Sequence, residues 1–309
     1  MSESSASRAQ SIRSASKRLD SFHSASYFSA AVAQALAEAG LSPRNQYLAV
    51  RSAPLGAASP ELVTATFYSF SPAFVAARVP ACWDEAAPSE VCAARLAGVE
   101  AMCAELFSAS AAGSADSLEE LRAAAERVRE ALAPVLAAQD LSGRALYAGH
   151  RAALRPEAVR AQDGTLQVFL DLWADITLLR EYRGDGHLAS LISGGLTGLE
   201  AIVLDSATGR SFTPTAMRKS RGWSEEEWRA TAELLADRGL LTDGTDSADL
   251  AEEGLELKAA IEDLTDDSVA AAWEVLDDAA LAALKTDAKA LAVRVAESGT
   301  IPRKLFGHG

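Results

Sequence analysis

Helix-start signals recur at short intervals along this chain, and they constrain its fold more than any other feature of the sequence. A serine or threonine before a proline caps the first turn of a helix, and such pairs stand at Ser42-Pro43, Ser59-Pro60, Ser71-Pro72 and Thr213-Pro214. The segments between them are rich in Ala, Leu, Arg and Glu, which favour helices, and runs of β-branched residues are almost absent. The sequence therefore predicts a mostly α-helical protein.

The second half contains an order of signals that is typical of a winged helix-turn-helix. A short helix and then a longer one at 225–238 are expected, followed by the apolar Gly239-Leu240-Leu241, a tight turn at Asp243-Gly244 and a helix at 255–264. The segment 268–298 is expected to form one or two long helices, which suit dimerisation or packing on the first domain.

Similar signals recur about 154 residues apart, which indicates a pseudo-repeat. The matched pairs are Gly40-Leu41 with Gly195-Leu196, Ser59-Pro60 with Thr213-Pro214, and Phe70-Ser71 with Trp223-Ser224. A chance match of helix signals in a helical protein is the alternative. The predicted fold is thus mostly α, with two pseudo-repeated winged helix-turn-helix domains, a small β-wing and long connecting helices.

Irregular stretches set the predicted domain boundaries, since 309 residues are enough for two domains. The prediction is a disordered tail at 1–18, an N-terminal helical domain at 19–140, a linker at 141–164, a C-terminal winged-helix domain at 165–300 and a tail at 301–309.

The charge pattern argues against DNA as a partner. The formal net charge is −14, whereas DNA-binding proteins take their affinity from Lys and Arg side chains that neutralise phosphates. The helix expected in the major groove begins Glu225-Glu226-Glu227, and the predicted wing carries three aspartates and no cation. The one small basic cluster lies on the preceding helix and comprises Arg210, Arg218, Lys219 and Arg221.

No cofactor and no membrane segment are expected. The three cysteines, Cys82, Cys92 and Cys103, lack the spacing of a zinc site, and no glycine-rich phosphate loop or nucleophile elbow occurs. The sequence contains no run of eighteen apolar residues and no signal peptide. These features predict a soluble cytoplasmic protein that works without a metal or cofactor.

The strongest candidate for a functional site is the run from Arg180 to His187, which carries Arg, Glu, Tyr, Arg, Asp and His between two apolar segments. Histidine has an ordinary pKa near neutrality, and we expect His187 to act as a general acid or base that Asp185 orients. Gly184 and Gly186 flank Asp185 and permit the close approach of a ligand. The run therefore predicts one wall of a ligand pocket.

Further side chains are expected to complete this pocket. Arg183 suits a carboxylate or phosphate group, and Tyr182 offers a hydroxyl or a stacking face. The remaining predicted ligand contacts are Arg180, Glu181, Arg51, Tyr68 and Trp173. Two alternatives stay open: Arg–Asp pairs that pin two domains together, with His187 as a packing residue, or a lone His187 that ligates haem iron.

Five segments resemble an actinobacterial family of MarR-like helix-turn-helix proteins, and together they extend over about 20–300. They are the segments 51–56, 66–72, 179–187, 195–200 and 221–228. Tyr182 stands where many members of that family have His. The resemblance implies a helix-turn-helix fold and no particular activity.

These observations predict a small-molecule-binding protein with a pocket between its two halves. Whether it is an enzyme stays open; without a cofactor, its chemistry would be proton transfer, as in cyclisation, isomerisation or hydrolysis. The alternative is a ligand-responsive MarR-type transcriptional regulator that binds DNA as a homodimer. A third hypothesis is a sensor that binds protein partners.

Overall fold

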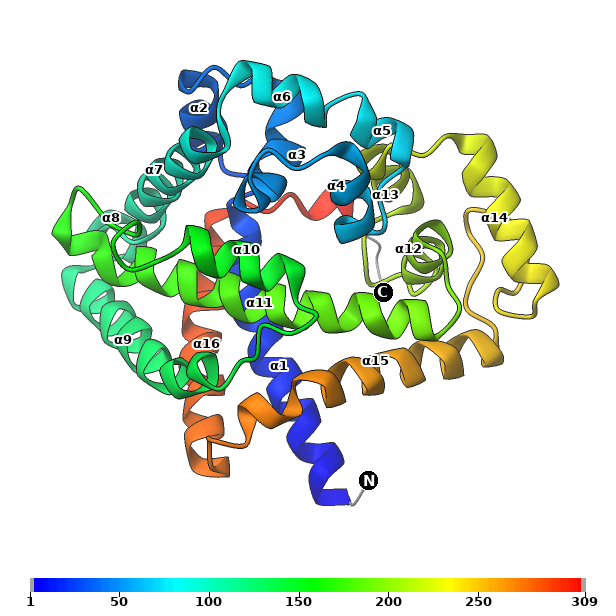
Figure 1. Cartoon of the computed structure of the whole chain (residues 1–309). Helices are drawn as coiled ribbons and strands as arrows, with labels where there is room; N and C mark the ends of the chain where they lie inside the picture. Colours follow the sequence, from blue (N-terminus) through cyan, green and yellow to red (C-terminus); the bar gives the residue numbers. More distant parts are fainter. Residues whose placement is uncertain (1–2, 307–309) are drawn as a thin grey trace. The chain divides into compact units, whose positions relative to one another are not determined.

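The structure, a computed structural model, describes residues 3–306, and the chain forms two compact units (Figure 1). Each unit is assembled from segments that are distant in sequence, so both take residues from either side of the predicted linker at 141–164. Unit 1 comprises Met1–Ala57, Cys82–Asp185 and Asp266–Ile301, and unit 2 comprises Ala58–Ala81, Gly186–Thr265 and Pro302–Gly309.

The prediction of a mostly α-helical protein is confirmed, and residues 3–306 contain helices and two isolated β-bridges but no strand. Several predicted helix starts are observed. The side chain of Ser59 accepts a hydrogen bond from Leu62 N at the start of α4 (Pro60–Phe67), and Ser224 caps α14 (Glu225–Asp237) in a capping box with Glu227. Helix α13 (Pro214–Arg221) begins in the same way as α4.

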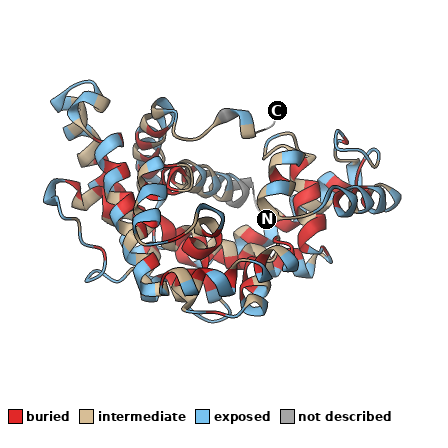
Figure 2. Cartoon of the chain, turned by 90° about the horizontal axis from the view of Figure 1, so that it is seen from above, coloured by how far each residue is buried: buried red, intermediate tan, exposed pale blue. Residues whose placement is uncertain are grey.

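Unit 1 is built by helices that bury apolar faces against one another, and Figure 2 shows the buried residues along these faces. Helix α1 packs along α16, α16 also packs along α9, and α2 packs along α7. The elements are α1 (Glu3–Ala25), α2 (Ala30–Glu38), α3 (Pro43–Ser52), η1 (Ala53–Leu55), α7 (Pro88–Leu106), α8 (Ala109–Ala112), α9 (Ala115–Ala137), α10 (Ala145–Ala153), η2 (Gly164–Leu166) and α16 (Asp278–Ser298).

The predicted disordered tail at 1–18 is instead the first part of α1, apart from residues 1–2, which lie outside the described residues. Ala15 and Leu19 are buried in the unit 1 core, and Arg13 forms an ion pair with Asp266 at 2.6 Å. Such long-range packing is not visible in the polar composition of this segment. Part of the predicted tail at 301–309 also packs: in unit 2, Thr213 N donates to Leu305 O at 2.9 Å, whereas residues 307–309 lie outside the described residues.

The predicted linker at 141–164 contains α10, which packs against η1. This approach requires glycine at position 149, because a Cβ atom there would lie 2.9 Å from the carbonyl oxygen of Pro54. The close contact places α10 beside the polar interior of unit 1.

Unit 2 contains α4, α5 (Pro72–Ala76), α12 (Gly198–Ser206), α13, α14 and η3 (Arg303–Leu305) around the buried Trp228 and Leu235. The predicted β-wing is reduced to a single bridge between Leu241 and Leu250. The pseudo-repeat is not observed in the described residues, because α4 and α5 lie in the same unit as α13 and α14, and α5 has five residues where α14 has thirteen.

Three helices contribute residues to both units: α6 (Val79–Glu85), α11 (Gln167–Ser193) and α15 (Glu252–Trp273). Helix α11 is continuous through Gly184 and Gly186, the two glycines of the predicted pocket wall. Each glycine weakens a helix by about 1 kcal/mol relative to alanine. Burial of the flanking apolar residues on almost every side of α11 outweighs that loss.

Candidate functional site

The run from Arg180 to His187 lies inside α11, so its side chains point in different directions around the helix. Positions 185 and 187 are two residues apart, which places them on nearly opposite sides. The structure therefore distributes the predicted site residues among three environments.

Asp185 does not orient His187. Its carboxylate accepts hydrogen bonds from the backbone N–H groups of Leu146 at 3.2 Å and Tyr147 at 2.9 Å, at the start of α10. Burial nevertheless raises the pKa of Asp185. The predicted acid–base pair is thus replaced by a carboxylate that caps α10, as carboxylates do at helix N-termini.

Tyr182 and Arg183 also make contacts within unit 1. The guanidinium of Arg144 lies 4.2 Å from the centre of the Tyr182 ring and donates a hydrogen bond to the Tyr182 carbonyl at 2.8 Å. Arg183 forms an ion pair with Asp266 at 3.1 Å. These contacts connect α11 with its neighbours inside unit 1. The alternative that the sequence left open was that Arg–Asp pairs hold two domains together.

The other predicted residues of unit 1 belong to a buried polar cluster, which we name the unit 1 polar cluster. Arg180 and Glu181 are adjacent residues that follow Trp173 by about two turns of α11. The cluster comprises these three with Arg51 on α3, Arg95 on α7, His23 on α1 and His150 on α10. Arg180 bonds to Glu181 at 2.6 Å and to Asp20 at 2.9 Å.

Charge interactions inside this cluster determine its protonation. Burial opposes ionisation of Glu181, but Arg180 first, and then His150, Arg51 and Arg95, lower its pKa to about 2. Burial lowers the pKa of His150 to about 4, although Glu181 opposes this shift. Burial, followed by Arg180 and Arg95, lowers the pKa of His23 well below its usual value. At neutral pH the carboxylate is charged and both imidazoles are neutral.

Arg95 and Trp173 are two residues of the cluster whose hydrogen bonding is incomplete. The Arg95 side chain is only 5% exposed, and its Nη1 donates a long hydrogen bond to Val50 O at 3.4 Å. Its Cζ lies 4.7 Å from the Trp173 ring centre. Among residues 3–306, the buried Arg95 Nη2 and Trp173 Nε1 have no hydrogen-bond partner. Two adjacent side chains therefore present unsatisfied N–H donors, each at a penalty of about 1–3 kcal/mol.

Because burial lowers the pKa of His150, we expect the free energy of unfolding to fall in acid. Because the folded pKa of His150 is about 4 and its ordinary value is 6.5, unfolding takes up protons between these values. The stabilisation is present above pH 6.5 and is lost as pH falls towards 4, by about 3 kcal/mol for this group. We expect urea unfolding curves to show this decline, and His150→Asn, which retains a donor for Leu146 O, to reduce its slope. If His150→Asn leaves the pH dependence of the free energy of unfolding unchanged, His150 is not the group responsible. His187→Asn is the matched control.

The remaining two predicted residues, Tyr68 and His187, line a pocket of about 170 Å³ in unit 2. Nδ1 of His187 lies 3.0 Å from Thr265 Oγ1, and the side chain is 34% exposed. The hydroxyl of Tyr68 donates to the carbonyl of Leu196. These two predicted residues thus line the same pocket, and the imidazole contacts Thr265 and lies 4.0 Å from Glu262 Oε1.

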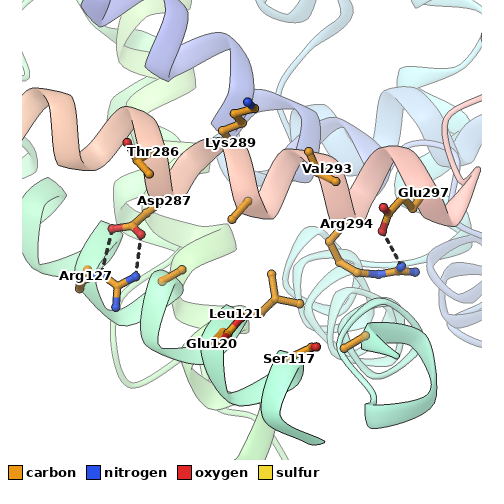
Figure 3. A pocket seen from close by; sticks show the side chains of 13 residues that line it. Ser117, Glu120, Leu121, Arg127, Thr286, Asp287, Lys289, Val293, Arg294 and Glu297 are labelled. Carbon is orange, nitrogen blue, oxygen red and sulfur yellow. Dashed lines mark hydrogen bonds and ion pairs between the residues drawn. The ribbon is translucent and has the colours of Figure 1, made fainter. Parts of the chain in front are cut away.

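A larger hollow of about 580 Å³ lies between α9 and α16 in unit 1 (Figure 3). Four of its charged side chains form two pairs: Arg127 bonds to Asp287 at 2.6 Å, and Arg294 bonds to Glu297 at 3.3 Å. None of its described lining residues has a buried polar side-chain atom without a hydrogen-bond partner.

The helices α13 and α14 have the order and the left-handed Gly222 turn of a helix-turn-helix. Helix α13 carries Arg218, Lys219 and Arg221, whereas α14 starts with three exposed glutamates. Arg218 is paired with Glu225 at 3.3 Å. The exposed start of the second helix would therefore repel DNA phosphates.

Other classes of site receive no support from the described residues. Residues 3–306 contain no group of three or more His, Cys, Asp or Glu side chains that would hold a metal ion. No single described helix has the length and apolarity to cross a membrane, and one bent pair, 164–193 with 198–206, passes the same test.

Arg95, His23 and His150 were absent from the predicted site. A signal for Arg95 exists in the sequence: it stands four residues after Val91 and four before Val99, on the stripe that Met102 continues, so an arginine occupies an apolar helical face. The histidines gave no such signal, because their partners come from distant segments.

Comparison with known sequences gives one match. Residues 12–302 match a family described as a helix-turn-helix family, and this range covers nearly the whole chain and both units. No curated protein and no solved structure matches the chain.

Proposed function

The chain belongs to the helix-turn-helix family that matches residues 12–302, and we propose that it binds a small organic anion in the unit 1 polar cluster. The observation that carries this proposal is Arg95, a buried guanidinium with an unsatisfied Nη2 and, among the described residues, no ion pair. A buried charge without a partner is strongly unfavourable. A bound anion would accept hydrogen bonds from Arg95 Nη2 and Trp173 Nε1, and it would also supply a negative charge beside the Arg95 guanidinium.

The chemistry of the donors favours a carboxylate or phosphate group. A guanidinium binds either group with two parallel hydrogen bonds. The neighbouring cations Arg51 and Arg180 raise the local positive potential. Glu181 is ionised and already forms an ion pair with Arg180. A second negative group is thus accommodated beside Arg95, and a planar ligand skeleton would stack on the aromatic side chains around it.

The cluster is accessible from one side. The Arg180 side chain keeps 30% of its surface exposed and its partner Asp20 keeps 42%, while Arg95 and Trp173 lie at the buried end. A ligand would approach past Arg180 and place its anionic group inside. Entry requires small side-chain movements, because the unsatisfied atoms have almost no exposed surface.

The test uses benzoate and inorganic phosphate as probes, with Arg95→Met as the variant. We expect a probe to raise the melting temperature of the wild-type protein, and Arg95→Met to weaken its binding about 10–100-fold. Without probe, Arg95→Met should be as stable as the wild type or more so, since it removes an unpaired buried charge. The control is Arg127→Met, in the paired surface hollow.

Two results would contradict this proposal. One is that neither probe changes the wild-type melting temperature or the heat of titration. The other is that Arg95→Met strongly destabilises the probe-free protein, which would make Arg95 a purely structural residue. Native mass spectrometry of freshly purified protein adds an independent readout, since a retained natural anion would appear as a mass that Arg95→Met lacks.

The second candidate is a ligand-responsive regulator of the MarR type that binds DNA as a dimer. The cations Arg218, Lys219 and Arg221 on α13 favour it, and Glu225 and Glu226 on α14 oppose it. A gel shift at low salt distinguishes the two hypotheses. Tight binding to the upstream DNA, with no binding to scrambled sequence and release by the anion, would favour the regulator.

A further inference from the structure

The backbone at Tyr68 adopts an uncommon conformation, with φ 55° and ψ −50°. Ser69 N donates to Phe67 O at 2.5 Å, so the three residues form a γ-turn of the positive-φ type, which is rare and strained. A non-glycine residue in such a conformation costs about 1–3 kcal/mol. Strain of this kind persists only where the surroundings fix it.

Four contacts within unit 2 fix this turn. The Tyr68 hydroxyl donates to Leu196 O, Trp223 Nε1 donates to Ser69 O at 2.9 Å, and Ser71 N donates to Arg221 O at 2.9 Å. Gly198 packs directly on the turn, because a Cβ atom there would lie 1.9 Å from Tyr68 O. The strained turn is therefore held rigidly, and its side chains form part of a pocket wall.

The pocket beside the turn has the size and the walls of a site for one aromatic ring. Its volume is about 170 Å³, and an apolar protein cavity of about 150 Å³ is known to hold benzene. The walls are mainly apolar and include Phe67, Leu188, Leu191, Leu196, Ile202 and Ile261.

His187 presents a polar ring to this pocket. Its Nδ1 lies 3.0 Å from Thr265 Oγ1 and 4.0 Å from Glu262 Oε1, and the Thr265 hydroxyl donates to Ile261 O at 2.7 Å. Thr265 is not among the residues that line the pocket, whereas His187 is.

The charged groups at the pocket disfavour an anion. Asp205 and Glu262 both line it, and the one lysine, Lys258, is paired with Asp205 at 3.0 Å. A carboxylate ligand would meet an excess of negative charge, while a neutral donor would not. This is the opposite preference to that of the unit 1 polar cluster.

We propose that the unit 2 pocket is a second ligand site, distinct from the unit 1 polar cluster, that binds a neutral single-ring phenol whose hydroxyl forms a hydrogen bond with the His187 side chain. The ring fills the apolar part between Phe67, Leu191 and Ile202. The assignment does not depend on the anion site, since every residue that it uses belongs to unit 2.

The experiment measures binding of phenol, benzene and benzoate by titration NMR. The wild type is expected to bind phenol more tightly than benzene and not to bind benzoate in this pocket. His187→Leu should weaken phenol binding about fivefold, the effect of one hydrogen bond, and leave benzene binding unchanged. Ala201→Phe, which adds a ring to the pocket lining at a half-buried position, should abolish both.

The control is Arg95→Met, which should bind phenol like the wild type even if it has lost anion binding. The proposal is overturned if the wild type binds neither phenol nor benzene, if Ala201→Phe keeps its phenol affinity, or if His187→Leu weakens benzene as much as phenol. Far-UV circular dichroism and the melting temperature of each variant show whether it is folded, so unfolding is not mistaken for a loss of binding.

Discussion

Glu181→Gln is expected to lower the free energy of unfolding by about 3–5 kcal/mol, the usual effect of removing one partner of a buried ion pair. Glu181 is 2% exposed and is the carboxylate that faces Arg180 at 2.6 Å. Its neutral replacement leaves Asp20 as the carboxylate that still pairs with Arg180, and it removes the negative charge that Arg51 and Arg95 also interact with. Because its pKa is lowered to about 2, the stabilisation is complete above the ordinary pKa of a glutamate and is lost only as pH falls towards 2.

Urea unfolding at pH 7, followed by circular dichroism, measures this effect. The matched control is Glu297→Gln, which removes the same charge from a pair whose carboxylate is 62% exposed and should change stability by less than about 1 kcal/mol. Combining Glu181→Gln with Arg95→Met should lose less stability than Glu181→Gln alone, since Arg95 is one of the cations that interact with Glu181. Equal effects of Glu181→Gln and Glu297→Gln would contradict the description of the cluster.

Gly198→Ala is expected to destabilise unit 2 by about 3 kcal/mol, at the upper end of the usual range for overpacking. The added Cβ would lie 1.9 Å from Tyr68 O and 2.7 Å from Tyr68 C. Both atoms belong to the backbone, so no side-chain rotation relieves the clash. Either α12 or the strained turn must move, and the pocket beside Tyr68 would change shape.

Thermal unfolding and phenol titration of Gly198→Ala test this expectation together. The control is Gly184→Ala in the middle of α11, where the atom nearest to an added Cβ, Glu181 Oε2, would be 3.8 Å away. That change should leave stability unchanged or raise it by about 0.5–1 kcal/mol, because alanine favours helix. A Gly198→Ala variant as stable as Gly184→Ala would show that α12 and the turn at Tyr68 are not closely packed.

Helix starts could be predicted from the sequence because capping is local. Ser59, Thr213 and Ser224 each satisfy backbone N–H groups two or three residues away, so the signal and its effect lie in the same few residues. The predicted pseudo-repeat is not observed among the described residues, and the local nature of capping explains this too. Matching starts say nothing about how long a helix continues or which elements it packs against, and α5 and α14 differ in both respects.

The candidate site was predicted only in part. Trp173, Arg180 and Glu181 come together because they are spaced by helical turns along α11. Asp185 and His187 were paired because they are close in sequence; in a continuous helix, residues two apart face different neighbours. Arg95 and His150 come from segments far from α11 in sequence, and only tertiary packing brings them to Glu181.

The pairing of α1 with α16 has a consequence for the order in which the chain folds. Arg18 near the end of α1 donates to Lys285 O at 2.9 Å, across 267 residues of sequence. During synthesis α1 emerges before α16, so the two helices can pack only after the whole segment between them has been made. The α1–α16 part of the unit 1 core therefore closes only after α16 has left the ribosome.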